Sequence, residues 1–521
     1  MDVNSPDQNI NKTSKYIHDY WDKLIKPPSN THKDVPISNP YISPSIKFNA
    51  LFYWDTYFQN LGLMIDDRYN LAVKCVENFI DEINKLGFIP NFNGPGWLSN
   101  TRSQPAFFCA MIHDLYSVSG DNDLLRKFVD SLKKEYKYWT TPPKKYKFNL
   151  SRYYDTSFWS KLQPYSSIAE SGWDITNRFR NVKKSLPIDL NCLLYLYERD
   201  IPRFLKIINN LEKNEEEKWA QARKERKKLI NKYMWDKKRG FFYDYSVRLK
   251  RVEKSSSLAG FFPMWIRIIT TERAEKCAKK AIEFLKPGGF VSTLDKKVKG
   301  FLKILKFMGL QWCYPIGWAP LQWIVNKALC NYNFHQLAAE SALKWINMIA
   351  RIFDEKEAIY EKYNVVNESI EDIQAHYEMH TGFGWTNAIF QALITRIIFG
   401  LEPKFPNQIQ FCPRIPASWK GASFNLSLNN FPRLGLKLKI NIETKDNSDK
   451  IDVEIETNKS ISMELKILKN IKTKFKSIII NSKQKIDEFK IIKFESSIEN
   501  NLIARSKNPI LFKKGKNTIS I

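Results

Sequence analysis

The sequence predicts a mainly α-helical protein with two domains, a large helical domain over residues 1–404 and a smaller β-rich domain over residues 405–521. Three observations support this prediction. With 521 residues, the chain is longer than one hydrophobic core usually supports. Apolar residues recur with a helical period up to about residue 400, and beyond it they alternate with polar residues. Finally, 43% of the residues are hydrophobic and 14% aromatic, which is typical of a globular chain.

Two helices of the first domain are marked by their ends. An apolar stripe over residues 71–83 predicts a helix that Gly87 and Pro90 stop, because a glycine readily takes the left-handed conformation that closes a helix. Asp121 is the expected N-cap of a helix with apolar residues over 124–132.

Further helices follow in the same domain. Thr271 is similarly the expected N-cap before an apolar stripe that ends at Ile282, and another stripe covers residues 337–349. The highly charged segment 206–239, with its spaced apolar residues, predicts solvent-facing outer helices. Gly-Phe pairs recur where the helical patterns break, which predicts helical hairpins whose loops gather on one side.

The second domain is predicted to be a β-sandwich, because short alternating runs are separated by turns rich in Asn, Asp, Ser and Lys. The runs cover residues 424–428, 436–442, 451–455, 461–467, 478–480 and 518–521. The proline-containing stretch 403–416 is expected to join the two domains. Since this domain has no obvious catalytic motif, we expect it to have a packing or accessory role.

The net charge of +27 suggests a nucleic-acid partner, but the arrangement of the charges argues against one. The lysines are scattered along the whole chain, and no helix-turn-helix, zinc-finger or RNA-recognition signature accompanies them. We therefore expect a lysine-rich solvated surface and no nucleic-acid partner. Six histidines without metal-ligand spacing and the absence of a Gly-rich phosphate loop predict no metal and no cofactor.

A cytoplasmic location is expected from three features of the chain. Residues 1–13 are polar and lack the apolar core of a signal peptide. No window is long and apolar enough for a transmembrane helix, so no membrane partner is expected. The seven cysteines are odd in number and far apart, which predicts free thiols and no disulfide framework.

The most informative stretch of the chain places Glu170 and Asp174 on either side of a Ser-Gly-Trp turn. The glycine lets the backbone bend sharply, and the tryptophan offers a flat apolar face on which a sugar ring can stack. A carboxyl group beside such a face tends to keep its proton near neutral pH, as general-acid catalysis requires. The stretch therefore indicates a glycosidase site.

Further islands rich in Gly, Trp, Asp, Asn and Arg accompany this stretch. The islands are Phe52-Tyr53-Trp54-Asp55-Thr56-Tyr57-Phe58; Gly87-Phe88-Ile89-Pro90-Asn91 with Arg102-Ser103-Gln104-Pro105; Glu170-Ser171-Gly172-Trp173-Asp174 with Pro187-Ile188-Asp189-Leu190-Asn191; Gln311-Trp312 with Pro315-Ile316-Gly317-Trp318; and Glu361-Lys362-Tyr363-Asn364 with Gly382-Phe383-Gly384-Trp385. In this order they resemble the signatures of the trehalase family from about residue 45 to about residue 400.

The resemblance implies an (α/α)6 barrel and an inverting glycoside hydrolase, with the α,α-1,1 bond of trehalose as the expected target. In the family, the Asp of Ser-Gly-Trp-Asp is the general acid and the Glu of Glu-Lys-Tyr is the general base. These positions are Asp174 and Glu361 here. Inversion places the two carboxyl groups about 6.5–9.5 Å apart, with room for a water molecule. Glu170 and Glu378 are the reserve candidates for the second carboxylate.

The resemblance and the chemistry of the side chains also predict a set of substrate-binding residues. The set is Lys47, Trp54, Asp55, Asn91, Arg102, Ser103, Gln104, Gly172, Trp173, Trp312 and Trp385. Carboxylate, amide and guanidinium groups can bind pairs of sugar hydroxyls, and the tryptophans, with Trp318, can stack on pyranose rings. The expected partner is a small carbohydrate, and the oligomeric state is left open.

The chain departs from the trehalase pattern at several positions. Lys47 replaces a substrate-binding Arg, Cys313 replaces the Asp of Gln-Trp-Asp, and His376-Tyr377-Glu378 replaces a Gly-rich loop. The Arg-Pro-Glu segment before the catalytic acid has no counterpart, and Asp155, Lys161 and Pro164 lie in that region. Two alternatives therefore stay open: a related six-hairpin glycosidase that cleaves another α-glucoside or an α-mannoside, and a carbohydrate-binding pseudoenzyme.

Overall fold

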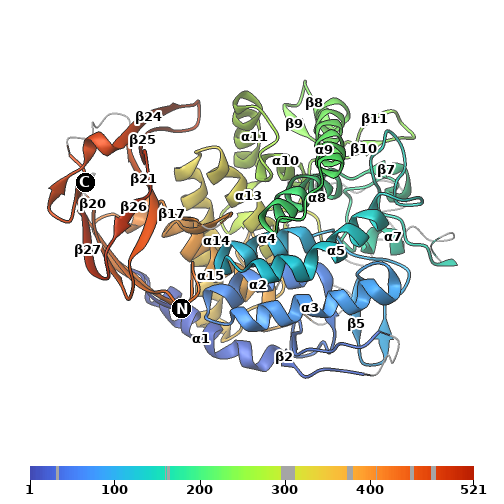
Figure 1. Ribbon diagram of the computed structural model, residues 1–521, viewed down its shortest axis with the longest axis horizontal. Coiled ribbons are helices and arrows are strands. Elements are labelled where there is room, and N and C mark those ends of the chain that lie inside the picture. Colours follow the sequence, from blue (N-terminus) through green and yellow to red (C-terminus); the bar gives the residue numbers. More distant parts are fainter. Residues whose placement is uncertain are drawn as a thin grey trace.

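The computed structural model describes residues 1–30, 35–158, 160, 165–294, 311–371, 373, 379–406, 408–445, 451–470 and 477–520. Helices fill one side of the molecule, and two β-sheets stand beside them (Figure 1). Both the first residues and the last residues of the described chain lie on the side of the sheets.

Six described helices form a closed ring in which each packs against the next and the last packs against the first. They are α2 (Tyr53–Ile65), α4 (Phe108–Ser119), α8 (Ile188–Ile207), α10 (Phe262–Trp265), α13 (Ala319–Asn331) and α15 (Gly384–Ala392). All residues of α2 and of α15 are buried. A helix that is buried on every side must be surrounded by other elements, so these two helices occupy inner positions of the ring.

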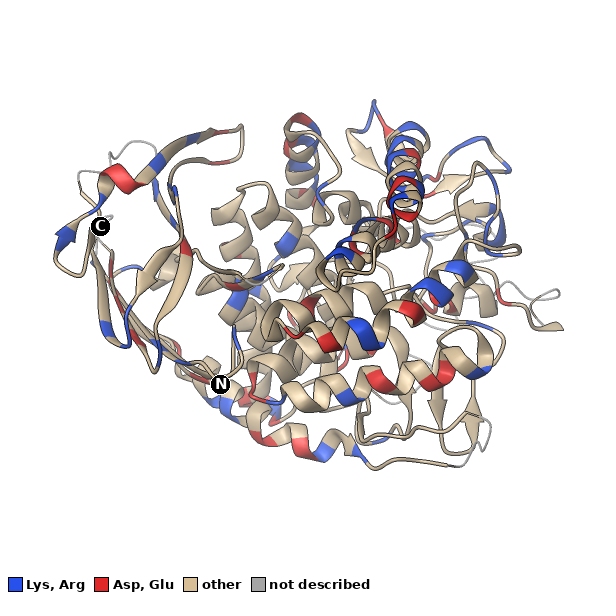
Figure 2. Ribbon diagram, in the orientation of Figure 1, with Lys and Arg blue, Asp and Glu red and all other residues tan. Residues whose placement is uncertain are grey.

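A second set of helices lies outside this ring. The set is α1 (Gln8–Leu24), α3 (Tyr69–Leu86), α5 (Asn122–Trp139), α9 (Lys213–Tyr233), α11 (Thr271–Phe284) and α14 (His335–Lys356). Bands of charged residues follow α3, α5 and α9 (Figure 2). In α9 only Arg226 and Ile230 are buried, which agrees with the prediction of a solvent-facing helix in segment 206–239.

The helix ends test the predictions made from local sequence. Gly87 closes α3 with φ +79°, and its N–H donates to the carbonyl of Ile83, as predicted. The Asp121 side chain accepts a hydrogen bond from the N–H of Asp123 at 2.9 Å and so caps α5, also as predicted. At α11 the prediction was wrong by one residue, because Thr270 is the N-cap and Thr271 is the first residue of the helix.

Two sheets stand beside the helices. The seven-stranded sheet has the order β1 (Asp2–Asn4), β18 (Ser423–Asn429), β19 (Lys437–Thr444), β20 (Ile451–Thr457), β27 (Gly515–Ser520), β22 (Ile479–Ile480) and β23 (Lys483–Gln484). The six-stranded sheet has the order β16 (Leu401–Lys404), β17 (Gln408–Phe411), β21 (Ile461–Asn470), β25 (Asn500–Ser506) and β24 (Phe489–Glu495), and β26 (Ile510–Phe512) also pairs with β21. The alternating runs predicted after residue 420 coincide with strands of these sheets, except that Leu436 and Ile478 lie one residue before β19 and β22 and Ile521 lies outside the described residues.

Two parts of the sheets were not predicted from the sequence. The stretch 403–416 is not a plain linker, because it contains the end of β16, an edge strand of the six-stranded sheet, and β17, which pairs antiparallel with β16 and parallel with β21. Pro403 fits in β16 because an edge strand does not need every backbone N–H for pairing. Strand β1, near the start of the chain, pairs with β18 at the edge of the seven-stranded sheet.

The hairpin of β24 and β25 holds the sheets against the helices. Its Glu499 side chain accepts hydrogen bonds from the N–H groups of Gln336, at 3.2 Å, and Leu337, at 2.9 Å, in the first turn of α14. A carboxylate is favourable at the N-terminus of a helix, where backbone N–H groups lack partners. Ser497 of the same hairpin donates to Glu275 of α11 at 2.5 Å.

Short strands and turns complete the fold and connect the helices. The short strands are β2 (Ile25–Lys26), β3 (Tyr41–Ile42), β4 (Leu51–Phe52), β5 (Phe92–Gly94), β6 (Trp97–Leu98), β7 (Ser185–Leu186), β8 (Trp235–Asp236), β9 (Phe241–Phe242), β10 (Tyr245–Ser246), β11 (Arg251–Val252), β12 (Leu285–Lys286), β13 (Gly289–Phe290), β14 (Ile316–Gly317) and β15 (Tyr363–Asn364). The short helical turns are α7 (Tyr165–Ala169), η1 (Val182–Lys184), η2 (Leu258–Phe261), η4 (Leu393–Ile398), η5 (Ala417–Trp419) and η6 (Ile486–Glu488). Among the described helices, none has the length and apolar character that crossing a membrane requires.

Candidate active site

Short strand pairings bring distant islands of the sequence together. Strand β4 pairs with β5, and the N–H of Tyr53 donates to the carbonyl of Asn91 at 3.2 Å. This pairing places the start of α2, with Trp54 and Asp55, beside the segment that carries Asn91. The side chain of Gln104 then accepts a hydrogen bond from the N–H of Trp54 at 3.0 Å. The first two islands therefore form one side of a common site.

A second pairing forms the other side of the site. Strand β14 pairs with β15, so the stretch that contains Trp312 lies beside Glu361. The N–H of Trp312 also donates to the carbonyl of Ile175 at 3.1 Å, and the Sγ atom of Cys313 accepts from the N–H of Asn177 at 3.1 Å. These contacts place the turn that carries Asp174 next to the other islands.

Three carboxylates meet where these islands converge. Asp55, Asp174 and Glu361 act electrostatically on one another. The pKa of Asp174 is raised to about 7, chiefly by burial and also by the negative charge of Glu361, while the positive charges of Arg102 and Lys362 act in the opposite direction. Burial likewise raises the pKa of Asp55 well above its usual range. A group with a pKa near 7 can donate a proton at neutral pH, which suits Asp174 to general-acid catalysis.

Glu361 is buried and held by its sequence neighbour. The Nζ atom of Lys362 donates to Glu361 Oε2 at 2.8 Å and to Gln311 Oε1 at 2.8 Å. Lys362 is itself buried and lies 5.1 Å from the centre of the Trp318 ring. The sequence alone did not establish whether Lys362 faces Glu361, because this depends on the backbone path between the two residues. The structure shows that it does.

Glu170, a reserve candidate for the second carboxylate, makes a different set of contacts. Its Oε1 atom accepts from the N–H of Ser103 at 2.9 Å and its Oε2 atom from the N–H of Tyr154 at 2.5 Å. Lys144, which is also buried, forms an ion pair with it. Glu170 thus ties three segments together. The other reserve candidate, Glu378, lies outside the described residues, as do His376, Tyr377, Lys161 and Pro164.

Gly172 is required by the geometry of the turn that joins Glu170 to Asp174. Its φ of +72° lies in the left-handed region, which other residues rarely adopt. A Cβ atom at this position would lie 2.6 Å from the ring of Trp54. The glycine therefore allows the turn to pack directly on the indole ring of α2.

Several predicted substrate-binding side chains hold the segments of the site in place. The Nδ2 atom of Asn91 donates to the carbonyls of Ser103 and Ala169, both at 3.3 Å. The hydroxyl of Ser103 donates to the carbonyl of Ile89 at 2.6 Å. The polar groups of Asn91 and Ser103 are thus engaged with the backbone, and they fix the loops that carry Arg102 and Asp174.

The tryptophans of the islands form one cluster. Trp54, Trp173, Trp312, Trp318 and Trp385 are all buried and contact one another through their rings. Trp312 and Trp318 are stacked, with ring centres 3.9 Å apart and an angle of 1° between the planes. The cluster is a buried apolar part of the site that contacts the turn before Asp174 through Trp54 and Lys362 through Trp318.

The remaining members of the predicted set lie nearer to solvent. The Nη1 atom of Arg102 lies 3.6 Å from Asp155 Oδ2, and a quarter of the Arg102 side chain is exposed. Asp155 was noted in the sequence only because it lies where the Arg-Pro-Glu segment is missing. Lys47 is exposed, which distinguishes it from the other predicted side chains.

One buried cluster beside the site was not singled out as functional in the sequence. Arg178 forms two-pronged ion pairs with Asp189 and with Asp244, at distances of 2.6–2.8 Å. Its guanidinium also lies 4.9 Å from the ring of Trp173. This cluster supports the far end of the turn that carries Asp174. In the sequence, the only signal for this cluster was Arg178 followed by the Pro187-Ile188-Asp189 segment.

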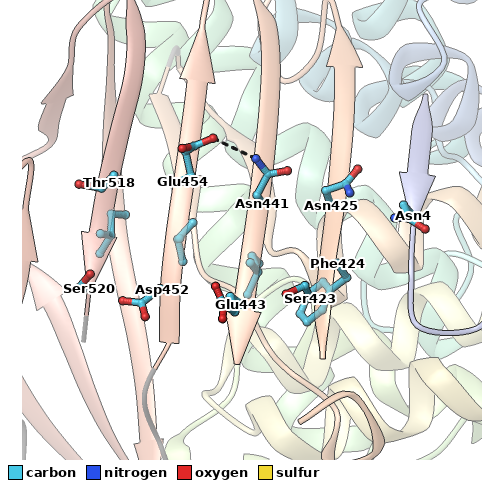
Figure 3. A pocket seen from close by; sticks show the side chains of 13 residues that line it. Asn4, Ser423, Phe424, Asn425, Asn441, Glu443, Asp452, Glu454, Thr518 and Ser520 are labelled. Atoms are coloured by element: carbon cyan, nitrogen blue, oxygen red, sulfur yellow. Dashed lines mark hydrogen bonds between the residues drawn. The ribbon is translucent and has the colours of Figure 1, made fainter. Parts of the chain in front are cut away.

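A groove elsewhere on the molecule lacks the two catalytic candidates of the site described above. It has a volume of about 430 Å³ and lies on a face of the seven-stranded sheet, lined by Asn, Ser, Thr and acidic side chains (Figure 3). Asn441 donates to Glu454 there at 3.1 Å. The paired catalytic candidates Asp174 and Glu361 are not among its lining residues. Within the described ranges, no three His, Cys, Asp or Glu side chains are grouped as a metal site requires.

Comparison with known proteins identifies the family. The family model described as "Trehalase" matches residues 2–167 and 156–397. A periplasmic trehalase from Escherichia coli is 29% identical over 454 residues, which cover 78% of this chain and 76% of the relative, and one from Shigella flexneri matches equally well. The solved structure of a neutral trehalase from Saccharomyces cerevisiae is 27% identical with a TM-score of 0.60, and the match covers 73% of this chain and 79% of that chain.

A mannosylglycerate hydrolase from Thermus thermophilus shares the fold. It is 15% identical with a TM-score of 0.55, and the match covers 74% of this chain and 100% of that chain. The mainly α-helical fold is therefore one used by several glycoside hydrolases.

The relatives contradict the prediction of a cytoplasmic location, because the matching Escherichia coli and Shigella flexneri proteins are named periplasmic trehalases. All seven cysteines are buried, and none of them forms a disulfide. Buried thiols pack as small apolar side chains and do not report the redox state of a compartment.

The order of the sequence islands, their convergence around Asp174 and Glu361, and the family match over more than half of the chain agree. This protein belongs to the trehalase family.

Proposed function

We propose that this protein is a glycoside hydrolase that cleaves trehalose into two glucose molecules with inversion, with Asp174 as general acid and Glu361 as general base. The observation that carries the assignment of roles is the meeting of these two carboxyl groups from distant parts of the chain, with the pKa of Asp174 raised to about 7. The reaction itself is supported by the family and by the relatives named trehalase.

The two carboxyl groups would act on opposite faces of one sugar ring. Asp174, protonated near neutral pH, donates its proton to the glycosidic oxygen as the bond from C1 to that oxygen breaks. Glu361 accepts a proton from a water molecule, whose oxygen attacks C1 from the opposite face. The attacked sugar leaves as β-glucose, while the leaving sugar keeps its α configuration. No cofactor takes part in this scheme.

The other predicted residues would bind the substrate or shape its site. The positive charge of Arg102 lowers the pKa of Asp174, and Asp174 raises the pKa of Asp55, so both residues face the acid and are proposed to bind sugar hydroxyls. Asn91, Ser103, Gln104 and Gly172 would position the loops, as their backbone contacts suggest. Trp54, Trp173, Trp312 and Trp385 would form the apolar floor, and Lys47 would act at the exposed margin.

We also propose an architecture for the whole chain. The closed ring of six helices would be the inner wall of an (α/α)6 barrel, with the second set of helices as its outer wall. Residues 1–404 would form the catalytic domain, and the two sheets would pack as a β-sandwich in residues 405–521. Strands β1 and β16 would then cross from the first domain to pair with the second.

The experiment that tests this proposal follows the glucose anomers released from trehalose by proton NMR. Equal initial amounts of α- and β-glucose would support inverting hydrolysis, provided that Asp174→Asn and Glu361→Gln release neither. Release of α-glucose alone would overturn the assignment of an inverting mechanism. If no glucose is released, trehalose is not the substrate, and other α-linked disaccharides and α-mannosides become the next substrates to test.

A further inference from the structure

The carboxyl group of Asp174 is held in place indirectly, through the residues beside it in the chain. Its oxygens form no hydrogen bond with any other residue that the structure describes. On one side, the carbonyl of Ile175 accepts a hydrogen bond from the N–H of Trp312 at 3.1 Å. On the other side, the N–H of Trp173 donates to the hydroxyl of Ser171 at 3.2 Å. The direction of the carboxyl group therefore depends on how firmly its two neighbours are fixed.

The indole ring of Trp173 is buried and has two close partners. Its centre lies 5.4 Å from the ring centre of Trp312, with an angle of 31° between the planes. The guanidinium carbon of Arg178 lies 4.9 Å from the centre of the same indole ring. A cation at this distance is attracted to an aromatic face, and the planar guanidinium can pack along it. Arg178 thus links the residue directly before Asp174 to another part of the protein.

The position of the Arg178 guanidinium is fixed by two carboxylates from other segments. Its Nη1 and Nη2 atoms donate to Asp189, the second residue of α8, at 2.6 and 2.7 Å. Its Nε and Nη2 atoms donate to Asp244, which lies between β9 and β10, at 2.8 Å each. Asp244 also accepts from the N–H of Ile188, the first residue of α8, at 2.9 Å. The guanidinium cannot rotate or shift without breaking at least one of these charge-assisted hydrogen bonds.

The influence of Arg178 on Asp174 is one of position more than of charge. The charges that shift the pKa of Asp174 are those of Arg102, Glu361 and Lys362. Arg178 is instead paired with two carboxylates, so it has no excess positive charge to offer a neighbour. A substitution that keeps its charge but alters its shape should therefore disturb mainly the geometry of the turn.

We propose that Arg178 is a positioning residue for the general acid: by fixing the indole of Trp173 to α8 and to the segment before β10, it aims the carboxyl group of Asp174 at the glycosidic oxygen. This inference rests on the proposed function, in which Asp174 is the general acid. A proton donor must lie within hydrogen-bond reach of the atom that it protonates. Since a misplacement of about 1 Å can cost about 10²-fold in rate, loss of this anchor should be visible in turnover.

Arg178→Lys and Asp244→Asn are the variants that test the anchor. Lysine keeps the positive charge, but it cannot bind two carboxylates in a two-pronged manner or pack as a plane on the indole ring. Asp244→Asn keeps Arg178 and its contacts with Asp189, so it gives a second measurement if Arg178→Lys does not fold.

The matched control is Arg226→Lys. Arg226, on the outer helix α9, is also buried, and its guanidinium donates to Glu198 at 2.7 Å and to Asn191 at 3.0 Å. Both of these partners belong to α8. The control therefore measures the cost of changing a buried, hydrogen-bonded arginine without changing the anchor of Trp173.

Two substrates separate a misplaced acid from a general loss of structure. Cleavage of trehalose releases a sugar whose oxygen must be protonated, whereas α-glucosyl fluoride releases fluoride, a much weaker base whose departure needs little help from an acid. Both substrates require the attack of water that Glu361 is proposed to assist. Initial rates with both substrates and thermal unfolding are measured for every variant, and Asp174→Asn shows the effect of losing the acid altogether.

We expect Arg178→Lys to lower kcat for trehalose about 10–10²-fold and kcat for α-glucosyl fluoride less than about threefold. Asp244→Asn should show the same pattern to a smaller extent. Arg226→Lys should lower the melting temperature and leave the ratio of the two rates as it is in the parent protein.

Three results would overturn the inference: unchanged rates in Arg178→Lys, an equal fall with both substrates, or an equally altered ratio in Arg226→Lys. In each case Arg178 is only structural, and the proposed function stands because the parent protein still cleaves trehalose. If the parent protein cleaves neither substrate, the proposed function is wrong and this inference fails with it.

Discussion

The two sides of the Ser-Gly-Trp turn use a carboxylate in opposite ways. On one side, Glu170 accepts hydrogen bonds from two backbone N–H groups and forms an ion pair with the buried Lys144. On the other side, the carboxylate of Asp174 forms no hydrogen bond with another described residue. Asp174 is only partly buried and interacts with Glu361 and Arg102 through their charges.

The difference shows how one short motif can serve both structure and chemistry. A carboxylate surrounded by donors is fixed in place and acts as an acceptor. A carboxyl group in an apolar setting with few donors keeps its proton to a higher pH and can give that proton to a substrate. Each prediction below changes one member of this arrangement and measures whether structure or chemistry is lost.

The largest effect is expected on the chemical side. Asp174→Asn should lower the turnover number about 10²–10⁴-fold, because the general acid is lost. Its melting temperature should stay near that of the parent protein, since Asp174 has no described hydrogen bond to lose. Initial rates with trehalose and thermal unfolding measure the two properties. If Asp174→Asn strongly lowers stability but hardly changes the rate, Asp174 has the structural role and Glu170 becomes the candidate acid.

On the structural side, Glu170→Gln should lower the free energy of unfolding by about 3–5 kcal/mol, because it leaves the buried ammonium of Lys144 without its counter-ion. Chemical denaturation measures this loss. The double variant Glu170→Gln with Lys144→Met should recover part of it, because the unpaired charge is then absent. Equal stability of the parent and the single variant would contradict the structural role.

The turn between the two carboxylates should be sensitive to a single methyl group. Gly172→Ala should lower the free energy of unfolding by about 2–4 kcal/mol, because a side chain at φ +72° is strained and its Cβ would clash with Trp54. Activity should fall as well, since the turn carries Asp174. Gly96→Ala is the control for backbone strain alone, because Gly96 has φ +85° but open space around it. It should destabilise less.

The smallest effect concerns the proton of Asp174. Since its pKa is about 7, the acid is protonated below that pH, and turnover should fall as the pH rises through about 7. Arg102 lowers this pKa, so Arg102→Gln should raise it and move the alkaline limb of log kcat to higher pH by about one unit. Lys74→Gln, at an exposed position of α3, should leave the limb in place. A shift to lower pH in Arg102→Gln would contradict the predicted sign.

Much of the helical fold could be predicted because helix ends are local. Gly87 and Asp121 act on the backbone within a few residues of themselves, and both behave as their residue types predict. The pairing of β1 with β18 could not be predicted, since three residues carry too little pattern and their partner is distant in the chain. The strand character of residues 403–416 was hidden by prolines that an edge position tolerates.

The candidate site divides in the same way. The islands that converge were recognisable, because rare residue types occur there in a family order. Lys144 was not, since one lysine in a chain with 82 Lys and Arg residues carries no signal of burial. The contact of Lys362 with Glu361 depends on the direction of two neighbouring side chains, which only the backbone conformation determines. The roles of Asp174 and Glu361 stay predictions until their variants are measured.

The edge position of β1 has a consequence for synthesis. Residues 2–4 are synthesised more than 400 residues before β18, so β1 has no partner strand until residues 425–427 have been made. Until then, neither strand can complete the edge of the seven-stranded sheet, and an unpaired edge favours association with other chains. Because of the order of translation, β1 can pair only after β18 has been synthesised.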